Sequence, residues 1–246
     1  MAQAHAQRFS APTLAPEGMT ALARRLAGGG AIFSDAERAL VAQRTHAYVR
    51  AKAALVRPDE LDLPLQIVQQ GWAVRVANLS HERRQIIGFL LPGDIVDLDS
   101  FVLDGAPVTF AVRALTPVEV CRFEAPAFRE FLESDPARLH AFTLYASEQR
   151  ARICWRLADI GQRKAAGRLA RLLLEFYDHL LSAGLVTDGA FECAASQYDL
   201  ADAIGTTPVH VNRVLREFKQ DGLIQLTRSA VHIKDRDALE ALADEQ

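Results

Sequence analysis

The chain has 246 residues, of which 50% are hydrophobic and 24% are charged, and its formal net charge is -3. This length accommodates two compact domains, and the mixed composition excludes a largely disordered chain. No apolar run approaches the roughly 20 residues that cross a membrane, so we expect a cytoplasmic protein without a membrane partner. A negative net charge does not favour nucleic-acid binding, which would then depend on a local cluster of positive side chains.

The first segment, residues 1–16, mixes Gln, His and Arg with Ala and lacks the apolar core of a secretory signal, so we expect a disordered leader. The cysteines are far apart and odd in number: Cys121, Cys154 and Cys193. Their spacing excludes a disulfide framework, suits a reducing compartment and matches no zinc or iron–sulfur pattern. We therefore expect neither a metal site nor a bound cofactor.

A helical pattern occupies residues 22–56, where Ser34 and Glu37 have the capping-box spacing. Beyond Pro58 the sequence changes to short runs rich in Val and Ile, at residues 67–68, 72–76 and 85–91. Turn-forming residues separate these runs. Short strands with regular turn signals predict an antiparallel β-barrel or roll.

A long helix is expected over residues 137–160, because Pro136 lies where a helix begins and nothing interrupts the segment. Its apolar side chains recur at three-, four- or seven-residue spacing along one stripe: Leu139, Phe142, Ala146, Ile153, Leu157 and Ile160. Such a helix spans about 35 Å, which is more than a small domain needs for itself. We expect a homodimer in which the stripe packs against its copy; the alternative is a core helix of the roll.

A second helix is expected over residues 163–181, closed by Gly184, with a short strand at 191–194. Ser196 and Asp199 can then cap a short helix that ends at Gly205.

Thr207 and Pro208 have the cap and first-position residues of the next helix, whose apolar face contains Val211, Val214, Leu215 and Phe218. Two strands follow, at residues 223–226 and 231–233, joined by a turn. Helix, glycine turn, capped helix and hairpin together predict a winged helix-turn-helix. We expect its DNA contacts to come from Thr207, Val209, His210, Asn212, Arg213, Arg216, Lys219 and Arg228.

From about residue 32 onward the chain resembles the superfamily of the cyclic-AMP receptor protein and the fumarate and nitrate reduction regulator (CRP/FNR). The resemblance is carried by Gly-Trp-Ala-Val-Arg at 71–75, Phe-Leu-Leu-Pro-Gly-Asp at 89–94, Ala-Val-Arg-Ala-Leu-Thr at 111–116, and residues 207–213 with their flanks. It implies an α+β protein with a cyclic-nucleotide-binding-like β-roll at 20–135, a dimerisation helix at 136–160 and a winged helix-turn-helix at 161–246. It also implies double-stranded DNA and RNA polymerase as partners.

The family's effector-site residues do not carry over. Members that bind cyclic AMP use a Glu for the ribose hydroxyl and an Arg–Ser pair for the phosphate, and the matching positions here are Leu98, Val108 and Thr109. Because an apolar Val cannot offset a buried phosphate charge, we expect a degenerate effector pocket and no response to cyclic AMP. The cysteine set of the oxygen-sensing members is also absent, since no cysteine precedes Cys121.

Two positions of the recognition helix have specific expected roles. Arg213 matches the Arg that contacts guanine in the family, and a guanidinium suits both acceptors on the guanine edge. Val209 stands where many members have Glu, so it would sooner contact a thymine methyl than accept a hydrogen from cytosine. We therefore expect a near-palindromic site whose half-sites differ from the usual family sequence.

Other functions have less support from the residues. An enzyme is disfavoured because no nucleophile with an adjacent base, paired carboxylates or phosphate-binding loop is found, and the glycine run at 28–30 fits a loop. A ligand-binding module that no longer binds DNA is disfavoured by Arg213 and Arg216. An effector-binding or redox-responsive regulator of the same fold stays open, with Cys193 just before the helix-turn-helix and Cys154 near the dimer stripe as candidate thiols.

Overall fold

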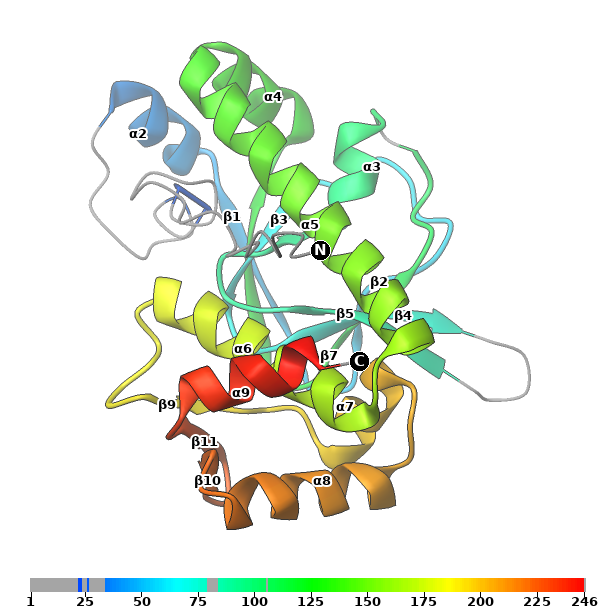
Figure 1. Cartoon of the computed structure of the whole chain (residues 1–246). Helices are drawn as coiled ribbons and strands as arrows, with labels where there is room; N and C mark the ends of the chain where they lie inside the picture. Colours follow the sequence, from blue (N-terminus) through cyan, green and yellow to red (C-terminus); the bar gives the residue numbers. More distant parts are fainter. Residues whose placement is uncertain (1–21, 24–25, 27–33, 79–83, 105, 246) are drawn as a thin grey trace, which may run out of the picture.

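The computed structural model describes residues 22–23, 26, 34–78, 84–104 and 106–245. The expected leader and the glycine run at 28–30 lie outside the described residues. Figure 1 shows a layered β-structure followed by helices, with α8 at one end of the molecule. None of the described helices is long and apolar enough to span a membrane.

Two four-stranded antiparallel sheets form the roll, in the orders β1-β8-β3-β6 and β2-β7-β4-β5. The strands are β1 (Thr45–Val49), β2 (Ala54–Val56), β3 (Leu65–Gln70), β4 (Ala73–Asn78), β5 (Arg84–Leu90), β6 (Ile95–Val96), β7 (Ala111–Ala114) and β8 (Val118–Phe123). The predicted α+β class and the antiparallel roll are confirmed.

The helical pattern predicted over 22–56 is only partly correct. The Ser34 capping box is present, with Glu37 N donating to Ser34 Oγ at 3.1 Å, and it starts α2 (Asp35–Ala42). Beyond α2 the chain forms β1 and β2 instead of helix. β1 pairs antiparallel with β8, so that residue 46 lies opposite residue 121. Such a distant pairing overrides a local pattern, because strand preference depends on the neighbours that a strand meets.

The sheet β2-β7-β4-β5 is buried on both faces. In β4, Ala73 belongs to the core between the two sheets, whereas Val74 and Val76 belong to a second core shared with the C-terminal helices. Strands buried on both sides have near-continuous apolar sequences instead of alternating ones. This accounts for the uninterrupted apolar run from Trp72 to Val74.

Helices cover the roll and extend away from it. They are α3 (Leu98–Val102), α4 (Ala125–Glu133), α5 (Pro136–Gln162) and α6 (Ala165–Ser182). The predicted long helix is confirmed in α5, a single helix of 27 residues that begins with Asp135 Oδ1 accepting from Ala137 N at 2.9 Å. Figure 1 shows α5 crossing the molecule from α4 to the region of α7.

An aromatic cluster joins the roll to α6. The Phe176 ring on α6 lies 5.0 Å from Trp72 and 4.7 Å from Phe89, both in edge-to-face geometry. These three side chains belong to one continuous hydrophobic core that includes the helices after α6. The roll and the C-terminal region are therefore packed together by apolar burial as well as joined by α5.

The C-terminal region has the predicted helix-turn-helix and wing. Its elements are β9 (Ala190–Glu192), α7 (Gln197–Ile204), α8 (Pro208–Gln220), β10 (Ile224–Leu226), β11 (Ala230–Ile233) and α9 (Arg236–Asp244). The strands form one sheet in the order β10-β11-β9. The sequence patterns did not predict α9, which packs along α6.

Gly71 is the glycine on which the start of β4 most depends. It has φ +86°, and a Cβ there would lie 2.1 Å from the Pro117 carbonyl oxygen, whereas Gly184 has φ +65° and open space around it. Gly184→Ala should cost about 1–2 kcal/mol for the left-handed backbone alone. Gly71→Ala should cost roughly 1–3 kcal/mol more, because the backbone must also move. Urea unfolding would measure both variants, and equal midpoints would contradict the expected clash.

Candidate nucleic-acid interface

Local capping fixes the geometry of the helix-turn-helix. Asp199 N donates to Ser196 Oγ at 3.2 Å at the start of α7, and Gly205 ends that helix in the left-handed region with φ +67°. His210 N then donates to Thr207 Oγ1 at 3.2 Å, with Pro208 at the first helical position of α8. Each cap uses the residue that the sequence predicted for it.

One face of α8 is buried and the other is open. Val211, Val214, Leu215 and Phe218 are buried, as their spacing predicted. Most of the expected DNA-contacting residues are exposed: Thr207, Val209, Arg213, Arg216, Lys219 and Arg228. In Figure 1, α8 lies along the edge of the molecule, with the other elements on one side of it. The open face therefore has the length and the cations that a major groove requires.

Arg213 has two partners on its own helix. Its Nη2 lies 3.3 Å from His210 Nδ1, and its Nε lies 3.8 Å from Glu217 Oε1. The Arg213 side chain is 65% exposed and that of Glu217 is 50% exposed. An exposed ion pair of this kind contributes only about 0–1 kcal/mol, so the guanidinium can exchange it for a guanine edge.

Asn212 and Val209 differ from one another in their surroundings. The Asn212 amide donates to Gln197 Oε1 on α7 at 3.1 Å, which ties the two helices together. Val209 is 81% exposed in the first turn of α8. An apolar side chain so open to water at this place is available to contact a thymine methyl.

The stripe on α5 is mostly exposed. Leu139, Ile153, Leu157 and Ile160 are exposed, and we refer to these four as the α5 stripe. Ala146 is partly buried against the core of its own protomer.

Phe142 is a correction to the predicted stripe. It is buried in the roll core, and its ring centroid lies 5.5 Å from that of Phe101 on α3. The seven-residue spacing did not reveal this, because α5 has a second apolar face that packs on the roll.

The three positions of the expected effector pocket do not surround a common cavity. Leu98 packs in the core beneath the helices, Val108 packs in the core between the sheets, and Thr109 is exposed. Apolar side chains fill the interior of the roll. The three positions therefore do not form the single effector site that the family's motif would serve.

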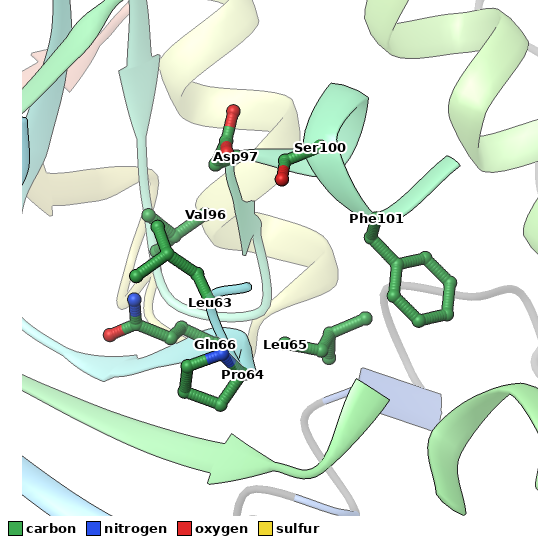
Figure 2. Close-up of a pocket in the computed structure, with 8 residues that line it drawn as sticks. All are labelled: Leu63, Pro64, Leu65, Gln66, Val96, Asp97, Ser100 and Phe101. Atoms are coloured by element: carbon green, nitrogen blue, oxygen red, sulfur yellow. The ribbon is translucent and has the colours of Figure 1, made fainter. Parts of the chain in front are cut away.

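A small cavity beside α3 is shown in Figure 2, lined by residues 63–66 and by Val96, Asp97, Ser100 and Phe101. Its volume of about 10 Å³ is about enough for one water molecule. Asp97 precedes α3 with φ 48°, and burial raises the pKa of its carboxyl. Its Oδ2 is buried without a hydrogen-bond partner among the described residues. This cavity is too small for a nucleotide or another organic effector.

The candidate redox thiols have opposite environments. Cys154 is exposed on α5. Cys193 is half-buried before α7, and burial raises the pKa of its thiol to about 11. Because the thiolate is the reactive form, this shift argues against Cys193 as a redox sensor.

Sequence reasoning missed a polar network that links α5 to the roll and to α6. Tyr145 Oη donates to Asp94 Oδ1 at 3.2 Å, and His179 Nε2 lies 3.8 Å from Asp94 Oδ2. Nearby, Arg156 Nη2 lies 2.9 Å from Glu175 Oε2. Burial alone would raise the pKa of Glu175, but the neighbouring guanidiniums outweigh it and hold that pKa below its ordinary value.

One sign of this network was present in the sequence. Gln149 interrupts the apolar stripe, and its amide Nε2 lies 3.5 Å from Asp94 Oδ1. The polar residue in the apolar stripe, Gln149, therefore lies where α5 faces the buried carboxylate of Asp94.

The chain matches two protein families. The Crp-like helix-turn-helix domain matches residues 167–242, and the cyclic nucleotide-binding domain matches residues 46–135. The transcriptional regulatory protein btr of Bordetella pertussis is 30% identical over 193 residues, which cover 76% of this chain and 77% of that protein. The transcriptional activatory protein AadR of Rhodopseudomonas palustris is 28% identical over 198 residues, which cover 80% and 81%.

Solved structures share the fold. FixK2 from Bradyrhizobium japonicum superposes with a TM-score of 0.70 at 24% identity, covering 82% of this chain and 98% of that chain. A CooA variant from Carboxydothermus hydrogenoformans gives 0.66 at 16% identity, covering 87% and 93%.

The fold and the open recognition helix define a winged helix-turn-helix transcription regulator that binds DNA. The chain belongs to the CRP/FNR family.

The shifted thiol predicts a difference in alkylation rate. In the native protein at pH 8, iodoacetamide should modify Cys193 about a hundredfold more slowly than in urea, where its thiol regains an ordinary pKa near 8.5. Cys154, which is exposed, provides the accessible control in the same sample. Mass spectrometry of quenched time points would measure both rates. Native modification of Cys193 as fast as that of Cys154 would contradict the burial and the raised pKa.

Proposed function

We propose that this regulator acts as a homodimer through α5, binds a near-palindromic DNA site with two copies of α8, and does so without cyclic AMP. The corresponding division of the chain is a sensor-like roll at 20–135, a dimerisation helix at 136–160 and a winged helix-turn-helix at 161–246. In this proposal the protein has no catalytic role, works in the cytoplasm and influences transcription through RNA polymerase.

The exposed α5 stripe is the observation that carries the proposal. Leu157 is 73% exposed, and the other three residues of the α5 stripe are between 37% and 43% exposed. Leu139, Ala146, Ile153 and Ile160 are spaced by seven residues, the repeat by which two helices pack side by side over a long distance. In the proposed dimer, a two-fold axis along α5 would bring two recognition helices to one side, as a palindromic site requires.

Independence from cyclic AMP is supported by space and by charge. Val108 is 2% exposed within the packed interior of the roll, at the place where the family resemblance puts a phosphate-binding Arg. A phosphate there would need a cationic or hydrogen-bonding partner, and the Val108 side chain, buried among apolar residues, supplies neither charge nor hydrogen bond.

Charging the α5 stripe should disrupt the dimer. Leu157→Glu places a carboxylate next to its copy in an apolar interface, so we expect monomers by sedimentation velocity and weak binding to the operator. The matched control is Leu103→Glu, which charges a residue that is 66% exposed directly after α3 and does not belong to the α5 stripe. The control should stay dimeric and bind normally. A Leu157→Glu protein that sediments as a stable dimer would place the dimer interface elsewhere.

Arg213 and Lys219 should contribute to binding in different ways. Arg213→Ala should cost roughly 1–3 kcal/mol and relax discrimination at one base pair in each half-site, because it removes a bidentate base contact. Lys219→Ala should weaken all sequences alike and lower the salt dependence by about one unit per lost phosphate contact. Binding to a site library at two salt concentrations would measure both variants. If Arg213→Ala weakened every sequence equally, Arg213 would contact phosphate instead of a base.

A further inference from the structure

Arg84 joins the roll to the helix-turn-helix in a way that DNA contacts do not explain. It is the first residue of β5, and its guanidinium reaches α7. Arg84 Nε lies 2.7 Å from Asp202 Oδ2, and Nη2 lies 2.8 Å from Asp199 Oδ1. The neighbouring Gln85 donates its side-chain amide to the Asp202 carbonyl oxygen. Two side chains at the start of β5 therefore contact α7, one through its carboxylates and the other through its backbone.

The contact between Arg84 and α7 is partly buried, and its hydrogen bonds have a fixed direction. The Asp199 side chain is only 11% exposed, and it also accepts from Ser196 N at 3.0 Å as the cap of α7. Burial alone would lower the pKa of Arg84, but the hydrogen bonds and charges of Asp202 and Asp199 raise it. One planar guanidinium bridges two carboxylates on one helix face, a geometry that a lysine ammonium does not reproduce.

The other contacts across this boundary are mainly apolar. α7 packs along β5, and its buried side chains share one hydrophobic core with the roll. Phe176 on α6 packs against Trp72 and Phe89, and Arg156 on α5 pairs with Glu175 on α6. Apolar burial is non-directional, so an aromatic cluster on one helix fixes a point more firmly than an angle. Arg84 lies at the opposite end of β5 from Phe89. Its directed hydrogen bonds to Asp199 and Asp202 therefore fix the angle between α7 and the roll.

The position of α7 determines the position of α8. The two helices pack against each other across the tight Gly205 turn, and Asn212 of α8 donates to Gln197 of α7 at 3.1 Å. A rotation of α7 against the roll therefore carries the recognition helix with it.

We propose that Arg84 is a positioning residue for DNA binding, which fixes the angle of α8 relative to α5 by holding Asp199 and Asp202. This inference rests on the proposed homodimer through α5. In a two-fold dimer, the distance between the recognition helices sets the spacing between half-sites. The property that Arg84 controls is therefore the preferred spacing of the operator, more than the affinity for a single half-site.

The test uses the full-length protein and duplexes that carry two half-sites separated by spacers of different lengths, with a single half-site duplex for comparison. The wild type should prefer one spacer over those one base pair shorter or longer. Arg84→Ala should reduce this preference by about fivefold, because a charge-assisted contact to two partly buried carboxylates is lost. Its affinity for the single half-site should stay within about twofold of the wild type.

Two further variants separate positioning from general damage. Asp202→Asn removes the carboxylate charge that pairs with Arg84 and leaves the Asp199 cap in place, so it should reduce the spacer preference in the same direction even if Arg84→Ala folds poorly. Arg236→Ala is the matched control, because Arg236 on α9 also binds two carboxylates, Asp178 on α6 and Glu240 on α9, and none of these three residues belongs to the roll. The Arg236→Ala variant should keep the wild-type spacer preference.

Spacer preference unchanged in Arg84→Ala and Asp202→Asn would overturn the proposal. So would an equal loss of affinity for the single half-site and the full operator, because that is the result of a merely structural role. A wild-type protein that sediments as a monomer and shows no spacer preference would instead overturn the proposed homodimer, and the positioning role with it. Sedimentation of the wild type separates this case from the others.

Discussion

The burial of one sheet on both of its faces is the constraint on which the rest of the structure depends. One face of β2-β7-β4-β5 closes the roll, and the other face meets Phe176 through Trp72 and Phe89. Because the outer face is apolar, α6 cannot move away from it without exposing several large side chains to water. The position of α6 in turn places the helix-turn-helix beside the roll.

The helix α5 serves this arrangement with two different faces. Its inner face contains Phe142 and Tyr145, which are buried against the roll, and Tyr145 also bonds to the turn that carries Asp94. Its outer face carries the α5 stripe. One helix therefore connects the roll to the C-terminal region and keeps a separate apolar face for the proposed second copy, because 3.6 residues per turn point its side chains in different directions.

The sequence was sufficient for the features that depend on local chemistry. Thr207, Pro208 and Gly205 specify caps and a left-handed turn through their own side chains, so the helix-turn-helix was predicted with accurate ends. The strand β1 and the inner role of Phe142 were missed, because both depend on partners far along the chain. The contact of Arg84 with α7 has the same origin, since an arginine at a strand start has no local pattern that names its acceptors.

The shared core also determines an order of events during synthesis. The roll leaves the ribosome before α6 does, and its face with Trp72 and Phe89 stays open until Phe176 emerges. At about 5–20 residues per second, that interval lasts several seconds. During this time the nascent chain presents an apolar sheet surface of the kind that chaperones bind and that promotes aggregation. Completion of the DNA-binding half thus protects the half that was made first.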